Sequence, residues 1–284
     1  MPHSTTDDKN TLKRATFTRA SMDGRIRIAI LGLCLLGASS AQAVEPKPIT
    51  RPAPVRVASL AFIEPNGTRT PVVEVWSNGR VQALELGGTR ANPAQVTRTD
   101  RLTADEMREL YQLLAGDCRI SSLTTEGVRE TLQVASEQQQ LTADIEGAAQ
   151  TEVGLLVGKQ WHAVACPAVS ILTTRFPDVT EVQNVAAAQA RLQNIAAVAL
   201  IGGGAIADLQ ADAATRKLRE LHPEAGAITR RDLKMVRQLA NGTRFVQFHY
   251  AGAPGQSEGC LVSLTQSPQG PTRVSVLDSP TVVR

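Results

Sequence analysis

The sequence predicts an α+β protein with two small domains, each an antiparallel sheet with packed helices. Short runs of alternating apolar residues flank turns at Asn78 and Asn241, each followed by glycine, and an Asn-Gly pair in this setting is the strongest local signal for a β-hairpin. Other stretches have apolar residues at helical spacing and begin with a capping box, as from Thr103 to Glu106. Hairpins and helices of this kind pack as helices against antiparallel sheets.

The first predicted domain covers residues 56–178. The helix that follows Thr103 is expected to end at Gly116, because glycine readily adopts the left-handed conformation of a C-cap. In order, the expected elements are a strand at 55–63, a hairpin of 72–76 with 81–84, helices at 103–116 and 126–138, and a hairpin of 153–157 with 160–166.

A connecting segment, 179–204, leads to the second predicted domain, 205–284. The segment contains an alanine-rich helix that is expected to begin with a capping box from Thr180 to Gln183. The second domain is expected to be one helix laid on a four-stranded antiparallel meander. Its expected elements are a helix at 205–221 and strands at 233–239, 244–250, 259–265 and 272–277. The run 233–239 could instead extend a helix capped by Thr229, but its composition favours a strand.

Residues 1–43 have the pattern of a cleavable secretory signal with a leader before it. A basic region at Arg25 and Arg27 precedes an apolar run at 28–37, and Ala41-x-Ala43 is a signal cleavage pattern. The apolar run is shorter than the roughly 20 residues that a membrane-spanning helix needs. A retained anchor is the alternative. Cleavage predicts a secreted or periplasmic protein that contacts the membrane only through the signal before it is removed.

The leader before Met22 is either an extended basic region or the product of a misplaced start codon. A lipid anchor at Cys34 is rejected, because Leu33 precedes it where lipidation signals have a small residue. Cleavage would leave a proline-rich linker at 44–55, which favours an extended tether.

The charge balance argues against a nucleic-acid partner. The chain has 30 basic and 27 acidic residues, and the first 43 residues hold six and three of these, which leaves 24 of each in the mature protein. Proteins that bind nucleic acids normally carry a basic patch that neutralises phosphates. No such patch stands out in the sequence.

Three cysteines remain after cleavage, at 118, 166 and 260. Because an oxidising compartment favours pairing, a disulfide between Cys118 and Cys166 is predicted, with Cys260 left over. Three buried reduced thiols are the alternative. No Cys/His spacing indicates zinc, and no metal or cofactor is predicted.

Two motifs suggest chemistry that their surroundings do not favour. Residues 255–259 match the G-x-S-x-G pattern of hydrolases, but the pattern works at a strand-to-helix turn and here lies between two strands. Glycines 202–204 precede a helix but lack the spacing of a phosphate-binding loop, so they indicate a break between helices. The only two tryptophans, Trp76 and Trp161, lie in hairpins, where an aromatic side chain more often packs on a sheet than binds a ligand.

The first domain resembles a group of uncharacterised exported bacterial α+β proteins. The shared pattern comprises a Gly-Arg hairpin, a Leu-Thr-x-x-Glu helix start and a Thr-x-Val hairpin that ends in His-x-Val. In this chain it covers residues 72–166, with Gly79-Arg80, Leu102-Thr103, Glu106, Leu110, Thr151-Glu152-Val153, His162 and Val164 as the matching positions. The group has no known activity, so the resemblance implies no catalytic residue.

The function we expect is that of an exported, non-enzymatic protein for binding, inhibition or an accessory role in the envelope, with a protein or envelope partner. One alternative is a secreted hydrolase, for which Ser257, His249 and Glu258 are the first residues to inspect. The other is a carrier of a small ligand, with a pocket between helix and sheet in the second domain.

Overall fold

The computed structural model describes residues 52–89, 92–239, 241–252 and 259–278. The predicted signal and leader at 1–43 and most of the predicted linker lie outside this part of the chain. Residues 51–284 group into one compact unit. The two-domain division predicted within that unit stays a prediction.

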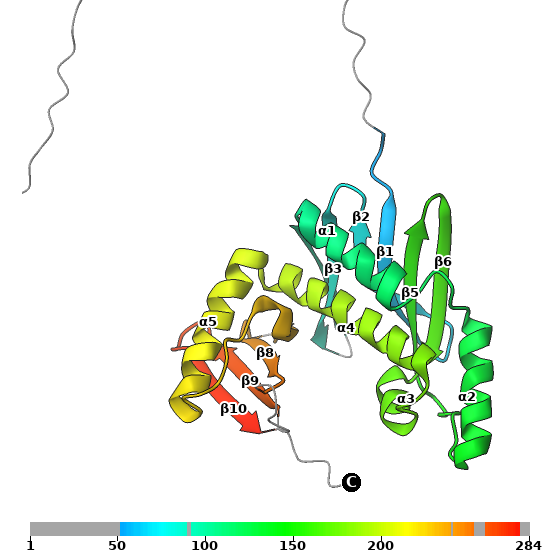
Figure 1. The fold of residues 1–284 in the computed structure, drawn as a ribbon. Coiled ribbons are helices and arrows are strands. Elements are labelled where there is room, and N and C mark those ends of the chain that lie inside the picture. The colour runs from blue at the N-terminus through cyan, green and yellow to red at the C-terminus, as the bar shows by residue number, and fades with distance from the viewer. Residues whose placement is uncertain (1–51, 90–91, 240, 253–258, 279–284) are drawn as a thin grey trace, which may run out of the picture. The chain divides into compact units, whose positions relative to one another are not determined.

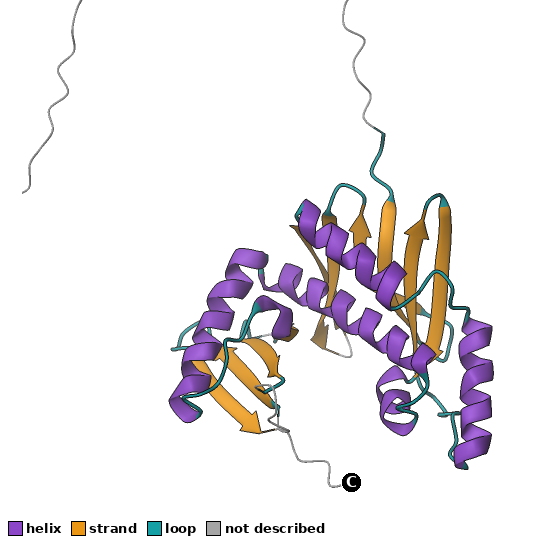
Figure 2. Cartoon of the chain, viewed as in Figure 1, coloured by secondary structure: helices purple, strands orange, loops and turns teal. Residues whose placement is uncertain are grey.

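The structure confirms the α+β class, with helices and two antiparallel sheets (Figures 1 and 2). Most expected elements are present, including the strand at the start of the second sheet that could have been helical. The first part contains β1 (Arg56–Ile63), β2 (Arg69–Trp76), β3 (Arg80–Thr89), β4 (Asn92–Arg101), α1 (Ala104–Tyr111), η1 (Gln112–Asp117), α2 (Thr125–Gln139), β5 (Gln150–Val157), β6 (Gln160–Pro167) and α3 (Val169–Arg175). The rest contains α4 (Thr180–Ile201), α5 (Gly204–Leu221), η2 (Arg230–Asp232), β7 (Leu233–Gln238), β8 (Arg244–Tyr250), β9 (Cys260–Gln266) and β10 (Arg273–Asp278).

The first sheet has six strands in the order β4-β3-β2-β1-β5-β6, all antiparallel. Helix α4 contacts all six strands. In Figure 1, α1 and α4 lie in front of these strands, and α2 lies beyond β6. One face of the sheet is therefore packed by helices.

Helix α4 contributes to two hydrophobic clusters. Its earlier turns place Val185 and Leu192 in the cluster under the first sheet, whereas Ala197 and Ile201 belong to the cluster under the second sheet. At its end Gly202 adopts a φ of 116°, a left-handed conformation that favours glycine. Gly202 and Gly203 therefore separate α4 from α5, and the predicted break between two helices is present, with Gly204 as the first residue of α5.

The second sheet is the expected meander, in the order β10-β9-β8-β7. Helix α5 contacts β9 and β10 and contributes small residues, such as Ala207 and Ala214, to a core that contains Phe248 and Leu264. No single described helix is long and apolar enough to cross a membrane, and α4 and α5 pass that test only as a pair with a 97° bend between them.

Several local predictions are wrong. Gly116 is not a C-cap, because the helical chain continues past α1 as the π-helical turn η1, which includes Gly116. Thr180 does not cap α4; it is the first helical residue and Val179 precedes it without a side-chain cap. The sequence analysis also missed β4 and α3.

The predicted disulfide between Cys118 and Cys166 is not present in the structure, where both are buried free thiols. Cys118 follows η1 and interacts with the backbone of Ala188 in α4, whereas the Sγ of Cys166 lies 3.6 Å from the carbonyl of Pro167 at the end of β6. Burial raises the pKa of the Cys166 thiol to about 11. The two side chains therefore serve as packed core groups.

Candidate functional site

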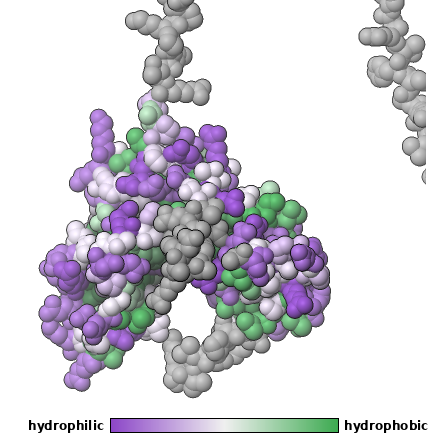
Figure 3. Space-filling view, turned by 180° about the vertical axis from the view of Figure 1, so that it is seen from behind, coloured by the Kyte–Doolittle hydropathy of each residue, from purple (hydrophilic) through white to green (hydrophobic). Residues whose placement is uncertain are grey.

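The six-stranded sheet has one face packed by helices and a second face that no described helix covers (Figure 2). In β5, Val153 and Leu155 are buried in the core, so Gly154 between them faces the second side. We call this second side the uncovered face. Figure 3 views the chain from behind, where hydrophilic and intermediate colours dominate around the start of β1.

Five side chains form a row across the uncovered face, which we call the Trp–Arg stripe: Arg101 of β4, Arg80 of β3, Trp76 of β2, Arg56 of β1 and Trp161 of β6. In the strand register, Arg80 is opposite Arg101 and Arg56 is opposite Trp76. The guanidinium of Arg80 lies 4.4 Å from the centre of the Trp76 ring, and that of Arg56 lies 4.6 Å from the centre of the Trp161 ring. Each such contact contributes about 0.5–1 kcal/mol at an exposed site.

Glycine at position 154 allows Trp161 to lie flat across β5. A Cβ atom on Gly154 would approach a ring carbon of Trp161 to 2.2 Å and the Oγ of Ser59 to 2.8 Å. The indole thereby covers Ser59, which is only 1% exposed although no described helix covers this face. The Oγ of Ser59 has no hydrogen-bond partner among the described residues. A buried hydroxyl with no hydrogen-bond partner lowers stability, so the described residues around Trp161 are not arranged for maximum stability.

The charges on the uncovered face do not cancel. Arg56 pairs with Glu74 at 2.7 Å, and Arg69 pairs with Glu152 at 2.8 Å. Arg80 has no carboxylate partner within the described part of the chain. The stripe therefore carries a net positive charge, most of it at its β3–β4 end.

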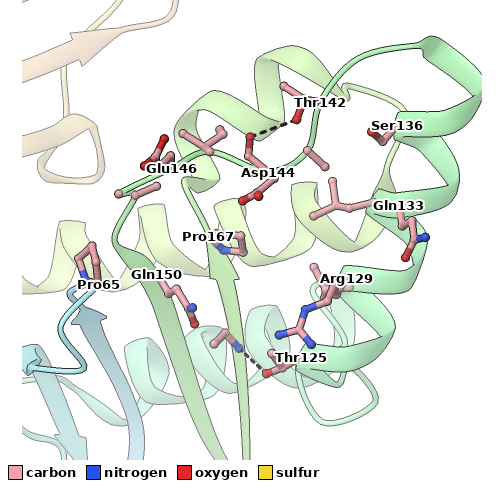
Figure 4. Close-up of a pocket in the computed structure, with 17 residues that line it drawn as sticks. Pro65, Thr125, Arg129, Gln133, Ser136, Thr142, Asp144, Glu146, Gln150 and Pro167 are labelled. Carbon is pink, nitrogen blue, oxygen red and sulfur yellow. Dashed lines mark hydrogen bonds between the residues drawn. The ribbon is translucent and has the colours of Figure 1, made fainter.

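A second candidate is a cleft of about 780 Å³ beside α2, which we call the α2 cleft (Figure 4). Arg129 and Gln133 extend from α2 on one side, and Asp144 and Glu146 lie on the segment opposite. Apolar side chains form much of the lining: Pro65, Val128, Leu132, Ala143, Ile145, Ala148, Ala165 and Pro167. The volume lies within the range of about 300–1,000 Å³ that is usual for ligand pockets.

The polar groups of the α2 cleft are held by local hydrogen bonds. The Thr125 hydroxyl accepts a bond of 2.9 Å from the backbone N–H of Ala165, which ties α2 to β6. Across the cleft, the Thr142 hydroxyl donates to the carbonyl of Asp144 at 3.2 Å, and the Thr142 carbonyl accepts a bond of 2.5 Å from Arg175. The charged residues of the lining are Arg129, Asp144 and Glu146.

A third polar cluster has a structural role. Asn194 of α4 is 5% exposed, and its Nδ2 donates to the carbonyls of Arg230, Arg231 and Leu233 at 2.8, 3.2 and 2.8 Å. Its Oδ1 accepts a 2.8 Å bond from Arg191. Asn194 thus fixes η2 and the start of β7 to α4.

Ionic contacts surround this cluster. Arg230 lies 3.1 Å from Glu106 of α1. Burial alone raises the pKa of Glu106, but the hydrogen bonds from Thr103 and the charges of Arg230 and Arg191 outweigh it, so that this pKa is lowered. Burial has the largest effect on the pKa of Arg191 and lowers it, and the positive charge of Arg231 lowers it further. These groups neutralise one another and hold elements together.

The residues considered for a hydrolase site are not brought together by the described structure. Ser257 and Glu258 lie outside the described residues. His249 is a half-buried residue of β8, next to Phe248 of the core. The motif falls between the antiparallel strands β8 and β9, as predicted, and not before a helix. Among the described residues, no group of three His, Cys, Asp or Glu side chains is placed to hold a metal ion.

No protein-family model, no curated protein and no solved structure matches this chain. The case for a function therefore rests on the chain's own residues. The resemblance to exported bacterial proteins stays a prediction.

Sequence reasoning missed the Trp–Arg stripe, because it interpreted Trp76 and Trp161 as sheet-packing residues. A usable signal was present. Val73 and Val75 have the parity of the packed face, so Trp76 must have the opposite parity. An aromatic residue whose side chain points to the opposite face from the buried apolar residues of its strand indicates a role at the surface.

Proposed function

We propose that the chain is an exported, non-enzymatic protein that binds a protein or envelope partner through the uncovered face of its six-stranded sheet. The observation that carries this proposal is the position of the only two tryptophans, Trp76 and Trp161, on the face of the sheet that no described helix covers, each stacked against an arginine. Tryptophan and arginine are the residues most enriched among the energetic centres of protein interfaces.

The chemistry of the stripe favours binding over catalysis. Arginine stays protonated at any physiological pH, and tryptophan is only a hydrogen-bond donor. Neither side chain exchanges a proton with a substrate. The tryptophan rings contribute contact area to a complex, and the arginines contribute directional donors. The stacking holds Arg56 and Arg80 in defined planes before a partner arrives, which lowers the entropy lost on binding.

Export is supported by the signal pattern in residues 1–43. In the envelope, a net positive stripe is complementary to an acidic surface on a partner, and such complementarity raises association rates. The proposal therefore favours an acidic partner.

The α2 cleft favours a second candidate, a carrier of a small ligand. Its volume of about 780 Å³ and its apolar lining suit a molecule with an apolar body. Asp144 and Glu146 on its rim favour a positively charged group on that molecule. The two candidates differ in which surface a bound molecule touches.

Photo-crosslinking in cells tests the proposal. A photoreactive amino acid replaces Thr99, which is opposite Gln82 and shares its side of the sheet, or the adjacent Arg98, which is opposite the buried Ala83. We expect a discrete crosslinked product from position 99 and none from position 98. The product should weaken when Arg56→Gln is added, because the contact with Trp161 is lost.

A third probe position, Gln133 on the rim of the α2 cleft, separates the candidates. Crosslinking from position 133 alone would favour the carrier. Equal products from positions 98 and 99, or none from either, would contradict binding through the uncovered face.

A further inference from the structure

Two arginines face each other at the β3–β4 end of the stripe. Arg80 and Arg101 are directly opposite in the antiparallel register, so their Cβ atoms are expected about 4.5–5.5 Å apart. Like charges in this arrangement destabilise a sheet. No carboxylate of the described residues pairs with either arginine, since the nearby Glu74 pairs with Arg56.

The β2–β3 turn holds both arginines in place. The carbonyl of Asn78 accepts two bonds of 3.3 Å from the Nε and Nη2 of Arg101, and the Oδ1 of Asn78 accepts a bond of 3.1 Å from the backbone N–H of Arg80. The carbonyl of Gly79 accepts a bond of 2.9 Å from the N–H of Leu102. A Cβ atom on Gly79 would lie 2.6 Å from the Leu102 carbonyl, and its φ is +81°, so only glycine fits here.

The two guanidinium groups keep donors that no described residue uses. Arg80 is stacked on Trp76 at 4.4 Å, and stacking occupies the face of a guanidinium but not the N–H groups at its edge. Arg101 donates from Nε and Nη2 to Asn78, which leaves the Nη1 side without an acceptor among the described residues. Arg101, but not Arg80, also lines an open hollow of about 600 Å³ between the turn and the start of α1.

We propose that Arg80 and Arg101 form a binding site for a phosphate group. Two adjacent guanidiniums present two positive charges, which match the charge of about −1.5 to −2 on a phosphate monoester better than the single charge of a carboxylate. Arginine donates to phosphate in a bidentate manner. A bound phosphate bridges the two cations and removes their repulsion. The proposal rests on the proposed function, since it names the chemistry that the uncovered face recognises.

Nuclear magnetic resonance on the nitrogen-15-labelled chain tests this site. Sodium phosphate is added against sodium chloride at constant ionic strength, and the indole N–H signals of Trp76 and Trp161 are followed. We expect a saturable shift of the Trp76 signal and of the Nε–H signal of Arg80. The Trp161 signal should change little, because its ring stacks with Arg56 and not with Arg80.

Charge-matched variants give the control. Arg80→Gln or Arg101→Gln should weaken phosphate binding about tenfold or more, because a charged hydrogen bond of about 1.5–3 kcal/mol is lost. Arg98→Gln removes the same charge from the same strand but on the other side of the sheet, and it should leave binding unchanged. A thermal melt of each variant shows whether it is folded.

Each outcome decides the proposal. Absence of a saturable shift, equal weakening by Arg98→Gln, or acetate acting as strongly as phosphate would overturn the phosphate site. If the phosphate site is overturned but crosslinking from position 99 persists, the proposed function stands without a phosphate site. If the phosphate site is present, sedimentation with vesicles that contain phosphatidic acid, whose headgroup is a phosphate monoester, assigns the phosphate to a lipid headgroup. This sedimentation should be absent with pure phosphatidylcholine vesicles and lost in Arg101→Gln. Phosphate binding without sedimentation assigns it to a soluble phosphorylated ligand.

Discussion

The two faces of the six-stranded sheet use the same strands for different purposes. On the packed face, Leu60, Val153 and Leu155 are almost fully buried under the helices. On the uncovered face, the described residues offer no hydrogen-bond partner to the Ser59 hydroxyl beneath Trp161 and no carboxylate partner to Arg80. The first arrangement maximises apolar burial, and the second tolerates costs to stability. Such costs are typical of surfaces selected for binding.

The largest expected effect lies on the packed face. Leu155→Ala should lower the free energy of unfolding by about 2–5 kcal/mol, because it removes a buried side chain and leaves a cavity. Its neighbour Leu156 has the opposite parity and is half-buried, so Leu156→Ala should cost about 1 kcal/mol or less. Urea unfolding of both variants measures the difference. Equal costs would show that the two faces do not differ as described.

The next effect lies on the uncovered face itself. Gly154→Ala should cost about 1–3 kcal/mol and change the tryptophan fluorescence, because the new Cβ displaces the Trp161 ring. Gly116→Ala is the control, since a Cβ there meets no atom closer than 3.9 Å. If Gly154→Ala behaved like Gly116→Ala, Trp161 would not lie across β5.

Thiol labelling distinguishes the faces by reactivity. Cys166 on the packed side has its pKa raised to about 11 by burial, and only a thiolate reacts readily, so a thiol reagent should modify it only as fast as the chain unfolds. Ala163→Cys places a thiol at an exposed position of the same strand, where labelling should be fast. A reductant should not change the unfolding midpoint. An intact Cys118–Cys166 bond in mass spectra would contradict the structure.

The smallest effect concerns pH. The pKa of Glu106 is lowered in the folded chain, so its carboxylate stabilises the fold above its ordinary value of 4.5, and this contribution is lost as the pH falls through the folded pKa. Glu106→Gln should reduce the free energy of unfolding at pH 7. It should also make that free energy decrease less as the pH falls into the acid range. Asp105→Asn, at an exposed neighbour, is the control. Unfolding by urea across the acid range is the measurement, and identical pH profiles for both variants would refute this role.

The fold could be predicted largely from local signals. Alternation and Asn-Gly turns are sufficient for the β2–β3 hairpin and for the second sheet, and helical spacing is sufficient for α2 and α5. Strand β4 was missed because Asn92–Arg101 is mostly polar and contains a proline, so its identity depends on pairing with β3. The continuation of α1 through Gly116 depends on packing that a C-cap rule does not include.

The candidate site could not be predicted, because it depends on register. A register shift between Arg56 and Ala58 places Arg56 opposite Trp76, and the Asn78 turn places Arg80 opposite Arg101. These residues are distant in sequence, and each alone looks like an ordinary surface residue. The disulfide prediction failed for a related reason, since cysteine count and compartment do not determine which side chains meet.

The most direct test of the central claim, that the uncovered face binds and does not only pack, is the stability gained from phosphate. A ligand that binds only the folded chain stabilises it by an amount that rises with its concentration. The free energy of unfolding should therefore rise more in sodium phosphate than in sodium chloride of equal ionic strength. Arg98→Gln should retain that gain, and Arg101→Gln should lose it. An equal gain in all three chains would reflect only the general effect of phosphate on protein surfaces and would contradict the account.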